Sequence, residues 1–188
     1  MAEDFKQWDA RGEDGTPRYQ RQSEIIKAAL AQPGHGLDRL LELMRTNGEG
    51  ALYLCGTRLD SDYAFGSGDL GTAISVLPED GPKAAIPGYH PASTEIYIVF
   101  QGGLVIESLV EGVLQTTPLE QYEVCVIPPG RCHRVRHDRH RKAASFIVKT
   151  NTRQKPGVVR CEECTYYPRL DECPLYRRWL EESLQTEG

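Results

Sequence analysis

Between residues 51 and 149 the chain is a succession of short β-type runs separated by breaks rich in glycine and proline. The runs are Ala51 to Cys55, Thr72 to Leu77, Glu95 to Gln101, Leu104 to Val110, Tyr122 to Ile127 and Ala143 to Lys149. Many short strands with such turns favour an antiparallel barrel or sandwich over a parallel α/β sheet. The Gly102-Gly103 pair also predicts a tight hairpin, which makes the strands beginning at Glu95 and Leu104 neighbours.

The segments on either side of this β region have a different pattern. Apolar residues at helical spacing predict two helices that cover one end or face of the β structure, broken at Pro33-Gly34. The first helix carries Ile25, Ile26, Ala29 and Leu30, and the second carries Leu37, Leu40, Leu41, Leu43 and Met44. We therefore divide the chain into an N-terminal helical segment (1–48), a β barrel (49–150) and a cysteine-containing C-terminal segment (151–188), which ends in a short helix over Leu175 to Leu184.

Composition limits the classes of partner. The 188 residues carry 22 Lys and Arg against 27 Asp and Glu, a net charge of -5, which argues against a protein that mainly coats nucleic acid. No run approaches 18 apolar residues, and the N-terminus lacks the basic and apolar regions of a signal peptide, so we expect no membrane partner and a cytoplasmic protein. In that compartment the six cysteines are expected to be metal ligands or free thiols rather than disulfides.

His90, Glu95 and His133 are the candidate ligands of a metal centre. Two imidazoles and one carboxylate would occupy half of an octahedron and leave positions open, which suits non-haem Fe(II) or another divalent metal. The alternative is an ordinary hydrogen bond at a barrel mouth. A carboxylate that begins the apolar run Ile96 to Phe100 is costly to bury unless it is paired or coordinated, and this favours the metal.

Cys161, Cys164 and Cys173 are candidate ligands of a second metal, a structural Zn or a rubredoxin-like Fe. A Cys-x-x-Cys pair places two thiolates around one ion, and a tetrahedral sulfur site needs four ligands. The fourth remains open between Cys132, Cys125, a histidine such as His137 or His140, and a cysteine of another subunit. The alternatives are an iron–sulfur cluster and free thiols.

Three further residues are candidate catalytic or substrate-binding groups. Arg131 shares strand parity with His133, so its guanidinium would lie near the barrel mouth and clamp a substrate carboxylate. His137 also shares that parity, about 13 Å further along the strand, and we expect it to face the substrate rather than ligate the metal. Tyr97 is expected in an aromatic and apolar wall. The alternatives without a function are that Arg131 belongs to a solvated basic face and that Tyr97 is an ordinary core residue.

Two segments resemble the metal-binding motifs of the cupin superfamily. Gly88-Tyr-His90-Pro-Ala-Ser-Thr-Glu95-Ile-Tyr-Ile-Val-Phe-Gln-Gly102 resembles the first motif, and Pro128-Pro-Gly130-Arg-Cys-His133 resembles the second. The resemblance implies a double-stranded β-helix, or jelly-roll, barrel in which His90, Glu95 and His133 point inward. The first of two histidines usual in the first motif is replaced by Gly88, so three ligands remain where cupins commonly have four.

The three-ligand barrel followed by cysteines is partially similar to the bacterial 3-hydroxyanthranilate dioxygenases. That similarity implies a mononuclear iron dioxygenase that brings a small anionic, possibly aromatic, metabolite and O₂ together at the metal. The spacing of the first motif and the single Cys-x-x-Cys pair depart from that family. A non-catalytic metal- or small-molecule-binding cupin acting as a sensor, and a metal-dependent isomerase or lyase, stay open. Self-association as a homodimer is expected from the resemblance alone.

Overall fold

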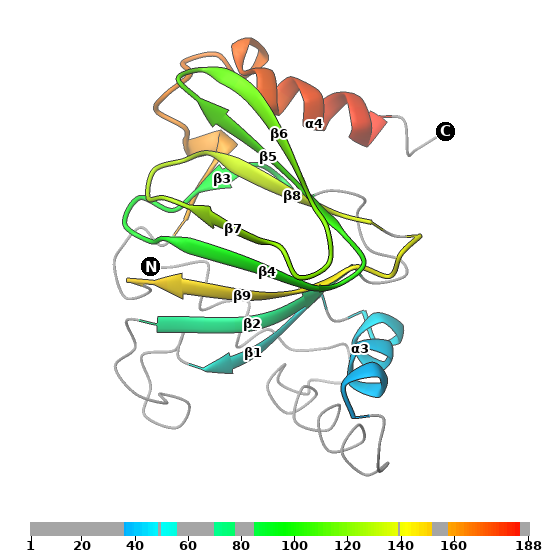
Figure 1. Ribbon diagram of the computed structural model, residues 1–188. Coiled ribbons are helices and arrows are strands. Elements are labelled where there is room, and N and C mark those ends of the chain that lie inside the picture. The colour runs from blue at the N-terminus through cyan, green and yellow to red at the C-terminus, as the bar shows by residue number, and fades with distance from the viewer. Residues whose placement is uncertain are drawn as a thin grey trace, which may run out of the picture.

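The computed structural model describes residues 36–48, 50–55, 70–77, 85–138, 140–151 and 158–184. It is mainly β, with two five-stranded antiparallel sheets (Figure 1). One sheet has the order β1-β2-β9-β4-β7 and the other has the order β10-β3-β8-β5-β6. The strands are β1 (Ala51–Cys55), β2 (Leu70–Val76), β3 (Gly88–Tyr89), β4 (Glu95–Gln101), β5 (Leu104–Val110), β6 (Val113–Leu119), β7 (Val124–Ile127), β8 (His133–His137), β9 (Ala144–Thr150) and β10 (Val159–Arg160).

The pairing of the strands identifies the fold as a jelly roll. β2 pairs with β9, β3 with β8, β4 with β7 and β5 with β6, so the chain runs out and back as one long hairpin. The pairs β4 with β9 and β5 with β8 then roll this hairpin into two sheets. The expected fold class, a double-stranded β-helix barrel with N-terminal helices and a short cysteine-containing C-terminal segment, is confirmed, and the described residues include the second of those helices, Gly36–Thr46.

The predicted hairpin at Gly102-Gly103 is wrong. β4 and β5 lie in different sheets, and the two glycines carry the chain across from one sheet to the other. Gly102 has a φ of 68°, and a Cβ atom there would lie 2.7 Å from the carbonyl oxygen of Arg141. The glycines therefore serve a close crossing between sheets rather than a hairpin. The two-residue turn that does join paired strands is Glu111-Gly112, with φ values of 51° and 78°.

Helices close two regions of the barrel (Figure 1). Helix α3 (Gly36–Thr46) packs Leu41 and Met44 against a cluster on the first sheet formed by Leu52, Ile74, Val76 and Ala144. The 3-10 turns η2 (Cys161–Glu163) and η3 (Leu170–Glu172) lead into helix α4 (Pro174–Leu184), which lies against the second sheet. The expected helix at Ile25 to Leu30 lies outside the described residues. No helix in the described part of the chain is long and apolar enough to span a membrane.

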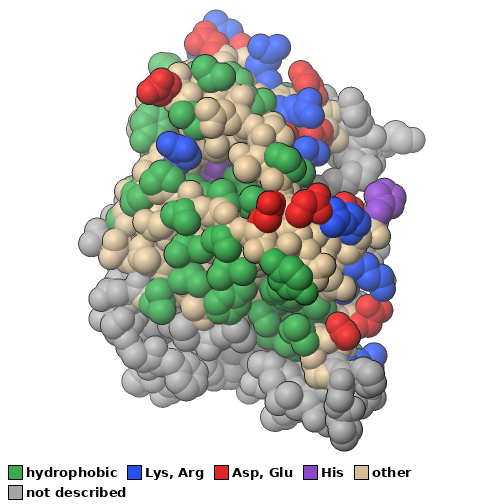
Figure 2. All heavy atoms as spheres, viewed as in Figure 1, with side chains coloured by type: hydrophobic (Ala, Val, Ile, Leu, Met, Phe, Trp, Pro, Cys, Tyr) green, Lys and Arg blue, Asp and Glu red, His purple; other side chains and the backbone are tan. Residues whose placement is uncertain are grey.

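A broad part of the outer surface is apolar. Figure 2 shows hydrophobic side chains gathered where Figure 1 has β4, β7 and β9. Val124 and Val126 on the edge strand β7 are 54% and 58% exposed. Inside the barrel, the core is formed by Tyr97, Val99, Leu104, Ile106, Leu119, Ile127, Val135 and Ala143. This core fills the barrel beside the candidate ligands.

Candidate metal centre

The three candidate ligands enter the barrel from both sheets. Along β4, Glu95, Tyr97 and Val99 are buried while the intervening side chains are only partly covered, so Glu95 points inward. His133 begins β8, and His90 follows β3, which pairs with β8 at Gly88 and His133. The amide of Gly130 donates to the carbonyl of His90 at 2.8 Å, which fixes the His90 segment beside the turn that precedes His133.

Glu95 lies between the two imidazoles. Its carboxylate is 1% exposed, with Oε2 2.7 Å from Nε2 of His133 and Oε1 3.4 Å from Nε2 of His90. Burial alone would raise the pKa of Glu95, but the adjoining His133 and His90 rings and the Lys149 charge outweigh it and hold that pKa well below its ordinary value. The group is therefore a carboxylate at neutral pH.

The chemistry of these donors fits a cation. Nδ1 of His133 lies 3.1 Å from the carbonyl oxygen of Arg131, which can only accept, so Nδ1 donates to that carbonyl and the ring is held with Nε2 toward Glu95. The two oxygens of Glu95 lie 2.7 and 3.4 Å from imidazole nitrogens of two different histidines. Two imidazoles thus converge on one carboxylate in a buried pocket, and a backbone carbonyl orients one ligand ring as in many metal sites.

Lys149, which sequence reasoning did not find, completes the group. It pairs with Glu95 across β9 and β4, and its Nζ lies 2.8 Å from Oε1 of Glu95 and 3.1 Å from Nε2 of His90. In the part of the chain that the structure describes, no three His, Cys, Asp or Glu side chains are spaced around a point suited to a metal ion. The donor types fit a metal, and the lysine stands among them.

The three predicted substrate-binding residues have different surroundings. Tyr97 is buried with its ring edge-on to His133, the centroids being 6.3 Å apart, so it forms part of the site wall. Burial, and then the neighbouring Glu95 charge, raises the pKa of Tyr97 well above its ordinary value, so its hydroxyl stays protonated. Arg131 contributes its carbonyl to His133, and its half-buried side chain interacts electrostatically with Cys125.

His137 does not join the site. Its Nε2 lies 3.4 Å from Oγ of Ser75, a residue that pairs with Ser145 on β9. Ser145 is four residues before Lys149, about 13 Å along a strand, so His137 lies toward the other end of the barrel. Burial first, and then the positive charge of Arg45, lowers the pKa of His137 to about 4. About four residues of strand length thus separate His137 from the ligands, and the expectation that it faces the substrate stays a prediction.

The structure brings a fourth cysteine to the three that the sequence singled out. Cys132, Cys161, Cys164 and Cys173 line one pocket, together with Tyr89 and Val159. All four are free thiols, and burial, followed by the charges of the neighbouring cysteines, raises the pKa of Cys132 to about 12. Of the fourth ligands left open, Cys132 is the one that lies with the others. The four belong to the turn before β8, to η2 and its C-cap, and to the residue before α4.

No protein-family model matches the chain, and no curated protein matches it. Among solved structures it is similar to a cupin-2 domain protein from Shewanella frigidimarina, with 20% identity over 44% of this chain and 72% of the other and a TM-score of 0.37. A double-stranded β-helix protein from Klebsiella pneumoniae gives 14% identity over 49% of this chain and 74% of the other, with a TM-score of 0.40. An oxalate oxidase bound to the substrate analogue glycolate gives 24% identity over 58% of this chain and 54% of the other, with a TM-score of 0.43. The resemblance to 3-hydroxyanthranilate dioxygenases stays a prediction.

Proposed function

We propose that this chain is a cupin-type metalloenzyme, a mononuclear non-haem iron dioxygenase that acts on a small anionic metabolite. The observation that carries the proposal is the meeting of Glu95, His90 and His133 inside a closed jelly roll, with the nitrogen atoms 2.7 and 3.4 Å from one buried carboxylate. Two imidazoles and a carboxylate are the donors typical of such iron sites.

Each group of the chain has a distinct part in the proposed site. His90, Glu95 and His133 would hold Fe(II), and the carbonyl of Arg131 keeps the His133 ring turned toward the carboxylate. Tyr97 keeps its proton and forms a buried wall that limits access of water on one side. The ion would supply a redox-active Lewis acid with open positions for substrate and O₂. One carboxylate does not balance a divalent charge, so an anionic substrate is favoured.

A non-catalytic small-anion-binding barrel is the second candidate. The contact between Lys149 and Glu95 favours it, because the lysine balances the buried carboxylate without any metal. Oxygen uptake separates the two candidates, since a binding protein consumes no O₂ with any ligand.

Metal content measured by elemental analysis tests the proposal. After anaerobic loading with Fe(II), the parent protein should retain about one iron in the barrel and take up O₂ with a member of a panel of small carboxylates and phenolic acids. His133→Ala removes an inward ligand and should lose that iron, because two remaining ligands hold Fe(II) weakly. His140→Ala, at an exposed position on the turn between β8 and β9, is the matched control and should retain it. Equal iron in the parent protein and His133→Ala would overturn the proposal.

We further propose that Cys132, Cys161, Cys164 and Cys173 hold a structural Zn or Fe ion. Cys132 and the three cysteines of the C-terminal segment line one pocket, and four sulfur ligands complete a tetrahedral site. Burial raises the pKa of the Cys132 and Cys161 thiols, which disfavours bare thiolates there, so a bound ion would supply the positive charge that deprotonated sulfur needs.

A further inference from the structure

Lys149 lies inside the proposed metal site rather than beside it. On β9, Ser145, Ile147 and Lys149 pair with Val99, Tyr97 and Glu95 of β4, whose side chains point into the barrel. Side chains that pair directly across two strands share one face of the sheet. Register therefore fixes Lys149 on the inner face, next to the carboxylate. Its side chain is 33% exposed, so the ammonium reaches the buried carboxylate from a partly open side.

The contacts of Lys149 are with the groups that the proposed function assigns to the metal. Its Nζ lies 2.8 Å from Oε1 of Glu95 and 3.1 Å from Nε2 of His90. An ammonium has three donors and no acceptor, so both contacts direct electron pairs at the lysine nitrogen. A divalent ion would use the same carboxylate oxygen and the same imidazole nitrogen. The lysine and the ion cannot both have them at these distances.

We propose that Lys149 is a resident cation that holds Glu95 and His90 in the metal-free protein, and that a divalent ion binds by displacing it. This inference rests on the proposed function, because it concerns the same three ligands. Without a positive neighbour, a carboxylate that is 1% exposed would be costly to bury. The lysine therefore stabilises the metal-free barrel and at the same time weakens metal binding, since the ion must displace one cation and remain near it.

Neutral substitutions at Lys149 separate these two effects. Lys149→Met keeps most of the side-chain volume without the charge, and Lys149→Gln is a second neutral variant if the first folds poorly. The control is Lys142→Met, because Lys142 is 62% exposed on its side chain and pairs only at 3.5 Å with Glu42, away from the barrel interior. Mn²⁺ is the probe, titrated by calorimetry under anaerobic conditions, and thermal melts are recorded with and without it.

The neutral variants should bind Mn²⁺ at least about tenfold more tightly than the parent protein, because one positive charge next to the ion is gone. Their metal-free melting temperature should fall, and Mn²⁺ should raise it by more than in the parent. Lys142→Met should match the parent in both measurements. Equal or weaker Mn²⁺ binding by the neutral variants, with binding by the parent intact, would overturn the inference and leave the proposed metal centre standing. Absence of Mn²⁺ binding in every protein would overturn both.

Discussion

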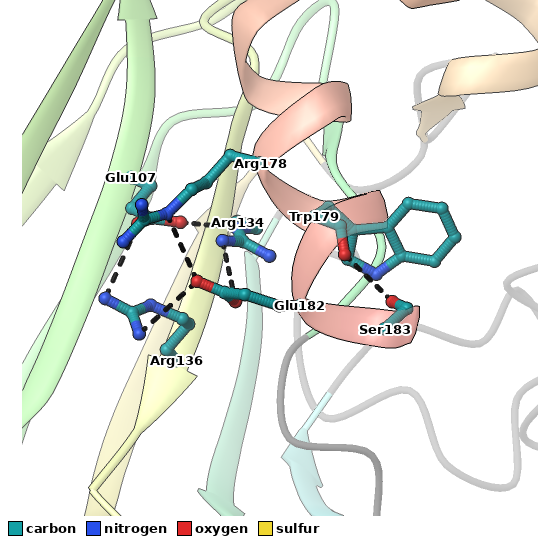
Figure 3. Close-up of polar contacts among 7 residues, drawn as sticks. All are labelled: Glu107, Arg134, Arg136, Arg178, Trp179, Glu182 and Ser183. Atoms are coloured by element: carbon teal, nitrogen blue, oxygen red, sulfur yellow. Dashed lines mark hydrogen bonds and ion pairs between the residues drawn. The ribbon is translucent and has the colours of Figure 1, made fainter. Parts of the chain in front are cut away.

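A buried ion pair within the second sheet lies beside helix α4 and should contribute strongly to stability. Glu107 on β5 and Arg134 on β8 pair across the strands, are 0% and 1% exposed, and form a direct ion pair. Figure 3 shows Arg178 and Glu182 of α4 reaching toward them. Nη2 of Arg134 lies 2.9 Å from Oε2 of Glu182, so the same guanidinium joins the sheet to the helix.

Arg134→Met removes the buried guanidinium and leaves Glu107 without its nearest partner. Breaking a buried pair by removing one member costs about 3–5 kcal/mol. Arg136 and Arg178 stay 3.5 and 3.7 Å from Oε1 of Glu107, so we expect the lower end, about 3 kcal/mol. In the double variant with Glu107→Leu no lone charge remains on the sheet, and the loss should fall to about 1 kcal/mol or less.

Urea denaturation followed by far-UV circular dichroism measures the free energy of unfolding of the parent, both single variants and the double variant. Arg169→Met is the control, because Arg169 and Asp171 form an exposed pair, and it should unfold with the parent. The reasoning is refuted if Arg134→Met loses less than about 1 kcal/mol with an unchanged dependence on urea, or if the double variant is as unstable as the single one.

Two further predictions concern buried groups outside the barrel ligands. The pKa of His137 is lowered to about 4 in the folded protein, so below about pH 6.5 the unfolded chain binds a proton at this ring that the folded chain does not bind. The free energy of unfolding should therefore fall by at most about 3 kcal/mol as the pH drops from about 6.5 toward 4. His137→Leu should lose this part of the pH dependence in urea titrations at about pH 7 and about pH 4.5. Cys173→Ser should remove the Zn or Fe of the cysteine site in elemental analysis, whereas Cys125→Ser, outside that pocket, should not; equal metal in both variants would contradict the site.

The sequence predicted best the strands that are mostly apolar. The expected bounds of β1, β4 and β5 match the structure, because apolar residues dominate them and glycines or polar turns end them. β6 was not predicted, because it is an edge strand whose residues are mostly exposed, and its Gln-Thr-Thr-Pro stretch has little β-type pattern. Gly102-Gly103 marked a turn correctly but carried no information on which sheet receives the next strand.

Some residues of the candidate sites could be predicted from the sequence and others could not. His90, Glu95 and His133 follow from spacing within two short segments, and the structure brings them together, while the role of each as a ligand stays a prediction. Lys149 and Cys132 did not follow from spacing. The neighbours of Lys149 are set by the register of β9 with β4, a long-range pairing that no local pattern encodes, and Cys132 reaches the other cysteines only because β10 pairs with β3 beside β8.

The two proposed metal sites lie on opposite sides of the same short segments, β3 and the start of β8. Cys132 lies in the cysteine pocket with Tyr89, and the next residue along the chain from each, His133 and His90, belongs to the barrel site. Successive side chains of an extended chain point to opposite faces, so β3 and the start of β8 present thiol and tyrosine outward and imidazoles inward. A variant of the cysteine pocket therefore acts one peptide unit from a barrel ligand. Loss of barrel iron in Cys132→Ser would report displacement of His133, whereas Cys164→Ser, which is not adjacent to a barrel ligand, isolates the thiol site itself.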